Sequence, residues 1–528
     1  MRFLLVNPYY PISETPSPPL GLAFLAAALE EAGVEVKILD LVVFPYSKKM
    51  LQSVLDDFSP HMVGITCVTM SFDHAIEVIK DVKSIDPSIL TVMGGPHATF
   101  CAEETLESFP ELDMIVLGEG EGTIVELAME AEKGHEWHRI EGLVYRKGSE
   151  ILNTGFRRPI ADVDSLPVPA RHLIPLGRYR ALGMPISMTT SRGCPFKCIF
   201  CVGRKMVGAN VRYRNPRAVV DEMAYLNTLN FHQINLADDL FTANKKHCLG
   251  VCNEILDRNL KIAWTSFGRV DTVSMKVLTK MKEAGCKAIS FGVESANAEI
   301  LKTIRKGITT EQVISAVKMC QEAGIMAHIS FILGLPGETP ETLKETVDFG
   351  EKIKDLGAFY GFHLLAPFPG TEVRQESDKY GIKILTDDWT QYHANRAIVE
   401  TSSVSQKMLD ETVMEWEKEC NEWLSKMQES TKRGEATEEE AFQVNRLEQT
   451  IIIYDLMMER VLENNRSCSN NKFDSFSDAL KSLIKKVACS TSYSEGQILS
   501  VLNSCLENGN LMYAAQNGHI KWDWVDFL

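Results

Sequence analysis

Residues 191–201 read Ser-Arg-Gly-Cys-Pro-Phe-Lys-Cys-Ile-Phe-Cys. This stretch is the most informative in the sequence for the fold of the central part of the chain. It places three thiols, Cys194, Cys198 and Cys201, at the spacing C-x-x-x-C-x-x-C, directly after an apolar run that predicts a strand. Three thiolates close together suit an iron-sulfur cluster, and the lack of a fourth leaves one iron open to an external ligand. A zinc site is the alternative, although zinc usually recruits a fourth Cys or His at recognisable spacing. The spacing favours a cluster with one open iron.

The strand before the cysteines is the first of a series in which strands alternate with helices. The predicted strands are residues 186–190, 233–236, 263–266, 288–291, 327–333 and 361–365. About six such units between residues 180 and 400 predict a partial (β/α)6 barrel. In that architecture the chemistry takes place on loops at the carboxyl ends of the strands, and the cysteine loop lies at such an end.

These features resemble the radical S-adenosylmethionine superfamily. The cysteine motif, the aromatic Phe200 before its third cysteine and its position after a first strand carry the resemblance. Later segments fit as well: DDLF at 238–241, GVES at 292–295 and ISFILGLPGE at 329–338.

The resemblance implies a 4Fe-4S cluster on the three cysteines, S-adenosylmethionine chelating the open iron, and a 5'-deoxyadenosyl radical formed when the cluster is reduced. An external electron donor of the flavodoxin or ferredoxin type is implied too. The implied contacts with S-adenosylmethionine are Phe200, Asp238, Arg269, Glu294, Ser295, Leu333 and Gly334. Glu294, Ser295 and Arg269 would contact its amino-acid or ribose part, and the Leu333-Gly334 region its adenine.

Residues 1–150 also alternate short apolar runs with helix-like stretches, which predicts a Rossmann-like, doubly wound parallel sheet. Such a sheet binds ligands at the carboxyl ends of its strands. Small and polar residues follow three of the predicted strands there: Thr66, Thr69 and Ser71; then Gly94, Gly95 and His97; then Gly118, Glu119, Gly120 and Glu121. We expect a ligand to bind at this edge of the sheet.

This segment resembles the cobalamin-binding domain that precedes the barrel in one branch of the superfamily. Pro19-Leu20-Gly21 and the glycine-rich loops at 94–99 and 118–121 carry that likeness. A Rossmann-like domain for another nucleotide is the alternative, but the G-x-G-x-x-G fingerprint is missing after the first strand. The motif D-x-H-x-x-G is absent too, so the resemblance implies cobalamin with its own base displaced and no histidine beneath the metal. His97 then either borders the cofactor or is only a loop histidine.

The rest of the chain divides into a Pro-rich linker at residues 151–179 and a mainly helical region at 401–528. Predicted helices at 405–427, 438–462, 476–487 and 494–507 are interrupted by a polar linker at 464–471. Two strand-like runs, 511–515 and 519–524, turn at Asn517-Gly518. Helices followed by a hairpin resemble a small winged-helix module, which we expect to dock a peptide or protein substrate.

Composition and net charge limit the kinds of molecule that the chain is expected to bind. The chain carries 71 acidic and 55 basic residues, a formal charge of -16, which disfavours a nucleic-acid substrate. No signal peptide is recognisable, and the apolar stretch at 20–29 is too short to cross a bilayer, so we expect a cytoplasmic location and no membrane contact. The 13 cysteines are then not a disulfide framework.

Together the two resemblances imply a cobalamin-dependent radical S-adenosylmethionine methyltransferase that C-methylates an unactivated sp3 carbon. A peptide or protein is the expected substrate, and one similar group modifies a glutamine in methyl-coenzyme M reductase. Two alternatives remain at this point. One is a ring-forming enzyme of the anaerobic magnesium-protoporphyrin ester cyclase type. The other is a cobalamin sensor without turnover, against which the three-cysteine loop argues.

Overall fold

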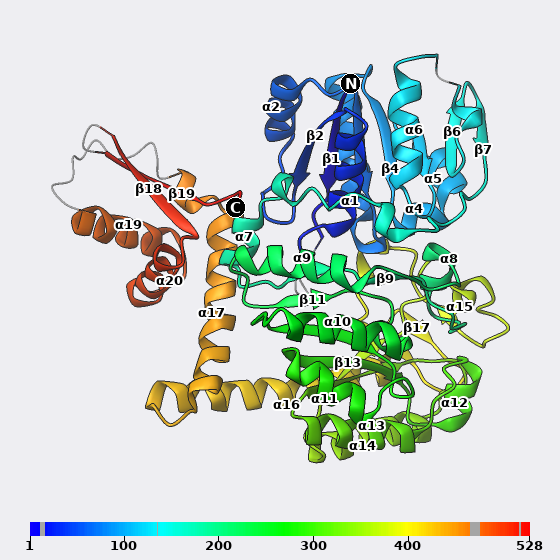
Figure 1. Cartoon of the computed structure of the whole chain (residues 1–528), viewed down its shortest axis with the longest axis vertical. Helices are drawn as coiled ribbons and strands as arrows, with labels where there is room; N and C mark the ends of the chain where they lie inside the picture. The colour runs from blue at the N-terminus through cyan, green and yellow to red at the C-terminus, as the bar shows by residue number, and fades with distance from the viewer. Residues whose placement is uncertain (11–15, 135, 465–475, 517–518) are drawn as a thin grey trace.

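The computed structural model describes residues 1–10, 16–134, 136–464, 476–516 and 519–528. Figure 1 shows an N-terminal domain stacked on a central parallel sheet, with the C-terminal helices reaching out to one side. No helix in these ranges is both long and apolar enough to cross a membrane.

A seven-stranded sheet forms the N-terminal domain. Its order is β2 (Glu35–Asp40), β1 (Arg2–Asn7), β3 (Met62–Thr66), β4 (Leu90–Gly94), β5 (Met114–Val116), β6 (Leu143–Lys147) and β7 (Glu150–Asn153). The first five strands are parallel, which confirms the doubly wound prediction. The sequence analysis did not predict β6 and β7, which add an antiparallel hairpin at one edge of the sheet. Gly148, with φ of 62°, stands in its tight turn.

Helices cover both faces of this sheet because its central strands are apolar on both sides. Along β1, Phe3 and Leu5 pack against α1 (Leu20–Glu31) and α6 (Glu121–Ala131). Leu4 and Val6 point to the other face, where they pack with residues of α2 (Lys48–Phe58), α3 (Phe72–Ile85) and α5 (Ala102–Ser108). Successive side chains of a strand alternate between faces, so such a strand reads as a continuous apolar run.

Six parallel strands form the central domain, as predicted. Their order is β15 (Phe359–Leu364), β14 (Met326–Leu333), β13 (Cys286–Glu294), β12 (Trp264–Gly268), β11 (Ile234–Leu236) and β8 (Ile186–Met188). The helices that alternate with them are α9 (Pro216–Thr228), α10 (Lys245–Asp257), α11 (Met275–Glu283), α12 (Ala298–Thr303), α13 (Thr310–Ala323) and α14 (Pro340–Asp355). A short antiparallel pair, β9 (Ser191–Arg192) and β10 (Arg212–Tyr213), flanks the cysteine loop.

Helices dominate the C-terminal region, as predicted. They are α16 (Gln406–Arg433), α17 (Glu438–Met458), α18 (Val461–Asn464), α19 (Phe476–Ser490) and α20 (Glu495–Glu507), and the hairpin of β18 (Leu511–Gln516) and β19 (His519–Trp524) follows. Residues 465–471 of the expected linker and the expected Asn517-Gly518 turn lie outside the described residues. Figure 1 shows α17 rising beside the central domain.

The chain end returns to the body of the molecule at α7 (Leu176–Ala181). Gly177 N donates to Asp526 O at 2.9 Å, and Arg178 pairs with Asp526 at 2.7 Å and with Glu463 at 3.0 Å. The C-terminal module, residues 476–516 and 519–528, is therefore fixed to α7 by half-buried polar contacts of Asp526.

Candidate active site

The three cysteines lie on an irregular loop between β9 and α8 (Gly203–Val207), which we call the cluster loop. Partial burial raises the pKa of Cys198, while the charges of Lys306 and Arg269 lower it. Cys201 accepts a hydrogen bond from Gly203 N at 3.3 Å. Such donors and cations favour the thiolate, which is the form that binds metal.

The donor set suits a cluster. Among the described residues, no three Cys, His, Asp or Glu side chains gather around one point, as ligands of a single ion do. In a 4Fe-4S cluster each thiolate binds a different iron, so the thiols need only be near one another. The three cysteines lie near enough that a charge on one raises the pKa of another.

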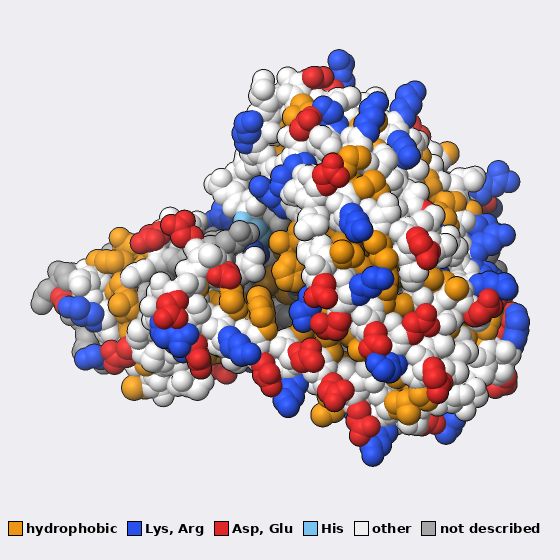
Figure 2. All heavy atoms as spheres, turned by 90° about the horizontal axis from the view of Figure 1, so that it is seen from below, with side chains coloured by type: hydrophobic (Ala, Val, Ile, Leu, Met, Phe, Trp, Pro, Cys, Tyr) orange, Lys and Arg blue, Asp and Glu red, His pale blue; other side chains and the backbone are white. Residues whose placement is uncertain are grey.

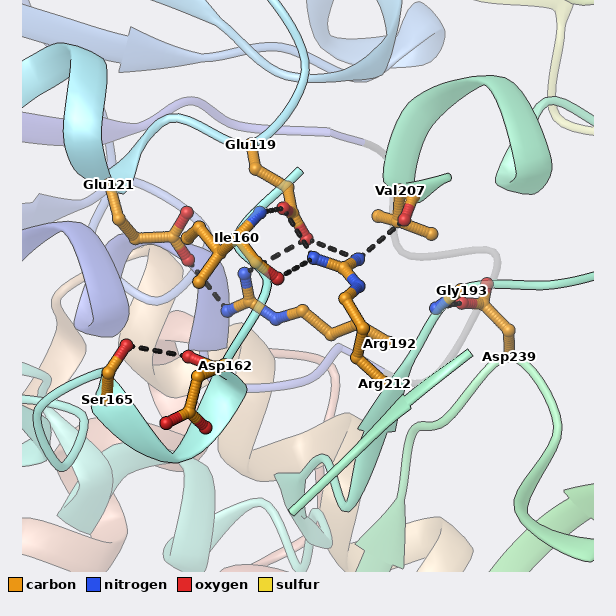
Figure 3. Close-up of polar contacts among 10 residues, drawn as sticks. All are labelled: Glu119, Glu121, Ile160, Asp162, Ser165, Arg192, Gly193, Val207, Arg212 and Asp239. Carbon is orange, nitrogen blue, oxygen red and sulfur yellow. Dashed lines mark hydrogen bonds and ion pairs between the residues drawn. The ribbon is translucent and has the colours of Figure 1, made fainter. Parts of the chain in front are cut away.

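Two adjacent carboxylates hold the start of the cluster loop. Asp238 accepts from Thr190 N at 2.5 Å, from Thr190 Oγ1 at 2.6 Å and from Ser191 Oγ at 2.6 Å. Asp239 accepts from Gly193 N at 3.2 Å, a contact drawn in Figure 3. Burial raises the pKa of Asp238. The Asp238 carboxylate is therefore hydrogen-bonded within the chain. These bonds position the loop that carries the cysteines.

A buried group of charges lies beside the cluster loop. Glu294, the last residue of β13, accepts from Lys306 Nζ at 2.7 Å. Arg269 donates to Lys306 O at 2.7 Å and pairs with Asp271 at 3.0 Å. Its guanidinium stacks 3.6 Å from the ring centroid of Phe196 on the cluster loop. The group thus holds two cations and two carboxylates that pair within the chain, and the contacts of Glu294 and Arg269 with S-adenosylmethionine stay a prediction.

Four further residues predicted to contact S-adenosylmethionine lie in buried or half-buried surroundings. Ser295 Oγ lies 3.3 Å from Thr346 Oγ1 and accepts from Asn297 N at 3.1 Å, so it fixes the start of α12. Leu333 is buried at the end of β14. Gly334, at φ of 85°, is covered: a Cβ there would lie 3.1 Å from Leu409 and 3.2 Å from Val399. Phe200 is half-buried, with Lys306 Nζ 5.9 Å from its ring centroid.

Glu338 shapes the turn after β14. Its buried carboxylate accepts from Gly334 N at 2.5 Å, and burial raises the pKa of Glu338 to about 7. The folded chain therefore binds the proton of the Glu338 carboxyl group more tightly than the unfolded chain does. The contribution of Glu338 to stability is fully present below its ordinary pKa and is lost as the pH rises through about 7.

We expect Glu338→Gln to remove that pH dependence. Thermal unfolding midpoints measured between pH 5 and 8 should fall more steeply with rising pH in the wild type than in the variant. The exposed, matched substitution Glu341→Gln serves as the control. Parallel curves for the wild type and Glu338→Gln would show that the carboxyl group does not titrate as described.

A cavity of about 290 Å³ opens at the carboxyl ends of the N-terminal strands, and we call it the sheet cavity. Its walls are Leu5, Gly21, Leu22, Leu25, Gly64, Ile65, Thr66, Val92, Met93, Gly94, Gly95, Pro96, Val116, Gly118, Glu119, Gly120, Glu121, Ile124, Arg192, Met206 and Val207. Its lining is mainly apolar and includes residues of both glycine-rich loops. Such a cavity suits an apolar or aromatic group, such as the base of cobalamin.

A second cavity, of about 410 Å³, lies between the two domains and is called the interdomain cavity. Its walls are Asn7, Tyr10, Ser17, Pro19, Gly21, Leu22, Thr66, Val68, Thr69, Met70, Ser71, Phe368, Tyr392, His393 and Ala394. Gly21, Leu22 and Thr66 line both cavities, so the two adjoin. The structure brings most of the predicted cobalamin residues to these two cavities.

Leu20 and His97 are the predicted cobalamin residues that line neither cavity in the described structure. His97 is buried, with its Nδ1 3.3 Å from Thr69 Oγ1 and its ring against Phe72 and Trp389. Burial lowers the pKa of His97 to about 4, so the ring is neutral at pH 7. His97 thus packs the N-terminal domain against Trp389 of the central domain.

An ion-pair network joins the sheet cavity to the cluster loop (Figure 3). Glu121 pairs with Arg192 at 2.7 Å, and Glu119 pairs with Arg212 at 2.8 Å. Arg192 stands two residues before Cys194. All four side chains are largely buried, with exposed fractions of 7 to 14%. The loop predicted to hold cobalamin therefore also fixes the entry to the cluster loop.

We expect Arg192→Gln to destabilise the chain by about 3 kcal/mol, because it leaves the buried Glu121 carboxylate without its partner. The double variant Arg192→Gln/Glu121→Gln should recover part of that loss. Denaturant unfolding of the protein without cofactors gives the coupling energy from the double-mutant cycle. Additive losses would show that the pair does not couple the two domains.

Two family models match the chain. A B12 binding domain matches residues 13–128, and the radical S-adenosylmethionine superfamily matches residues 188–350. These ranges contain the predicted cobalamin residues and the cluster cysteines with most of their surroundings. The N-terminal domain and the barrel thus define an enzyme that combines cobalamin with radical S-adenosylmethionine chemistry.

Relatives with both domains are known. The chain is 37% identical to an uncharacterized methyltransferase of Pyrococcus horikoshii, over 74% of this chain and 86% of the relative. It is 32% identical to the anaerobic magnesium-protoporphyrin IX monomethyl ester cyclase of Cereibacter sphaeroides, over 78% of this chain and 69% of the relative. The fold matches the cobalamin-dependent S-adenosylmethionine radical enzyme OxsB, with a TM-score of 0.70 and 19% identity, over 98% of this chain and 82% of that chain.

The chain belongs to the cobalamin-binding radical S-adenosylmethionine enzymes. Its cofactors are a 4Fe-4S cluster, S-adenosylmethionine and cobalamin, and its methyltransferase relatives place it on the methyltransferase-like side of the family. The sequence analysis missed Lys306, Arg192 and Arg212. The position of Arg192 beside the cysteine motif was the only local signal for any of them.

Proposed function

We propose that this methyltransferase C-methylates an unactivated sp3 carbon in a peptide or protein, with a glutamine side chain as one candidate. The observation that carries the proposal is the ion-pair network between Glu119, Glu121, Arg192 and Arg212, because it ties the cobalamin loop to the cluster loop. A methyl carrier and a radical generator must face one substrate, and this interface supports such an arrangement.

When bound, the cluster and S-adenosylmethionine supply a 5'-deoxyadenosyl radical, and cobalamin supplies the methyl group. The protein positions these partners and excludes competing reactions. Asp238 and Asp239 hold the cluster loop. Glu294, Lys306 and Arg269 would hold the amino-acid end of S-adenosylmethionine. The interdomain cavity, with Phe368 and Tyr392 on its barrel side, would hold the reacting carbon away from water.

Exposed apolar side chains on the C-terminal helices support a macromolecular substrate. Met414 and Trp423 of α16 are 64% and 53% exposed, and Ile451 of α17 is 52% exposed. Exposed aromatic and methionine side chains are enriched in protein interfaces. The exposed Lys197 and Lys205 beside the exposed Cys201 likewise support docking of an acidic flavodoxin or ferredoxin as the electron donor.

The test is anaerobic incubation of the cofactor-loaded protein with S-adenosylmethionine, a reductant and candidate glutamine-containing peptides. The proposal predicts 5'-deoxyadenosine and S-adenosylhomocysteine in equal amounts, and a peptide heavier by one methylene group. Equal products with small-molecule acceptors only would overturn the peptide assignment and leave methyl transfer intact.

A second candidate is ring formation, favoured by the 32% identity to the ester cyclase of Cereibacter sphaeroides. A cyclase does not transfer the methyl group of S-adenosylmethionine. Formation of 5'-deoxyadenosine without coupled S-adenosylhomocysteine would therefore replace the first proposal by this one.

A further inference from the structure

A third cavity, of about 690 Å³, lies between the central domain and the C-terminal module, and we call it the module cavity. Its walls are Arg180, Ala181, Leu182, Gly183, Met184, Asn230, Phe231, His232, Asn445, Arg446, Gln449, Thr450, Ile453, Ser504, Cys505, Glu507, Asn508 and Asn510. The cavity lies next to residues 182–184 and 230–232, which precede β8 and β11. The cysteines follow the other end of β8, so the cavity and the cluster loop lie at opposite ends of this strand. Figure 2 shows the molecular surface hollowed between the protruding module and the body.

Two half-buried arginines line the module cavity with only neutral partners. Arg446 donates to Gly183 O and lies 2.8 Å from His232 Nε2. Arg180 donates to Asn510 Oδ1 at 2.7 Å and to Gly509 O at 2.9 Å. Desolvation and the charge of Arg446 lower the pKa of His232 to about 4, so the ring is neutral at pH 7.

Neither guanidinium has a carboxylate partner among the described ion pairs. The other arginines at this end of the domain interface do have one: Arg171 pairs with Glu222 at 2.7 Å, and Arg178 pairs with Glu463 and Asp526. Glu507 also lines the cavity, but it is exposed and forms no described ion pair with either arginine. Among the described residues, these two partly desolvated positive charges therefore have only neutral hydrogen-bond partners, and a bound anion would complement them.

The remaining walls suit an anion with an organic part. The side-chain amides of Asn230, Asn445 and Gln449 offer neutral hydrogen-bond donors. Phe231, Met184 and Ile453 add apolar surface. A guanidinium matches the planar geometry and the charge of a phosphate group.

We propose that the module cavity binds a phosphomonoester of a small organic molecule, with Arg180 and Arg446 holding the phosphate. This site is separate from the radical chemistry and does not rest on the proposed function. Because its walls come from α7, α17 and α20, a bound ligand would strengthen the docking of the C-terminal module on the central domain.

Calorimetric titration of the full-length protein with phenyl phosphate tests the proposal, at constant ionic strength set with chloride. We expect saturable binding, and Arg180→Gln or Arg446→Gln should each weaken it about 10-fold to 100-fold, the loss of a charge-assisted hydrogen bond. Inorganic phosphate should bind to the same site more weakly, because it makes no contact with the apolar wall.

The control is Arg217→Gln, which removes the same charge from an exposed position on α9 and should leave binding unchanged. Circular dichroism in the absence of phosphate confirms that each variant is folded. Failure of the wild type to bind phenyl phosphate would overturn the proposal without reference to any variant. Equal weakening by Arg217→Gln would overturn it too, because binding would then follow net charge alone.

Discussion

Replacing Cys198 by alanine is expected to abolish the cluster and leave cobalamin in place. The loop then offers two thiolates, too few to hold a 4Fe-4S cluster, and iron after anaerobic reconstitution should fall from about four atoms per chain to background. Formation of 5'-deoxyadenosine should fall about 100-fold or more. Iron and sulfide analysis and the cobalamin absorption spectrum measure the two effects separately.

The matched control is Cys420→Ala, since Cys420 is an exposed cysteine on α16. That variant should keep both cofactors and full activity. Cobalamin should survive Cys198→Ala because the cobalamin cavities are built mostly from the N-terminal domain, whereas Cys198 lies in the central domain. Loss of both cofactors from Cys198→Ala would contradict this division.

The reciprocal effect is expected from Gly95→Ala, which should lose cobalamin and keep the cluster. Gly95 has φ of 99° and ψ of 175°, a backbone conformation almost confined to glycine. A Cβ there would lie 2.6 Å from Cys67 O and 2.8 Å from Cys67 N, both backbone atoms of the neighbouring loop. We expect cobalamin binding to weaken about 30-fold or more, equivalent to about 2 kcal/mol.

Gly94→Ala is the matched control, because Gly94 lines the same cavity but has no strained backbone. A Cβ at Gly94 meets nothing closer than Val116 O at 3.8 Å. It should weaken cobalamin binding less than Gly95→Ala does, as measured by equilibrium dialysis. Equal losses from the two variants would show that filling of the cavity, and not backbone strain, sets the affinity.

Much of the fold could be predicted because its signals are local. The five parallel strands β1 to β5 and the six strands of the barrel are short apolar runs bounded by glycine and polar residues. The β6–β7 hairpin was missed because residues 143–153 carry mixed polar and apolar side chains, and such strands at a sheet edge lack the continuous apolar signal of buried ones.

The candidate site was predictable where residues act through a motif and unpredictable where they act through long-range pairing. The cluster cysteines are adjacent in sequence. In contrast, Glu121 and Arg192 are 71 positions apart and meet only when the two domains dock. Glu119 and Glu121 were predicted to contact cobalamin, and their place in the sheet cavity fits that role. Their ion pairs with arginines could not be predicted, because sequence alone does not specify domain docking.

The central claim is that cobalamin and the cluster serve one active site across the domain interface. Pulsed electron paramagnetic resonance of the protein loaded with cob(II)alamin and reduced cluster tests it most directly. We expect a resolved magnetic dipolar interaction between the two centres, which disappears in both Cys198→Ala and Gly95→Ala. Two unperturbed signals from fully loaded wild-type protein would contradict it.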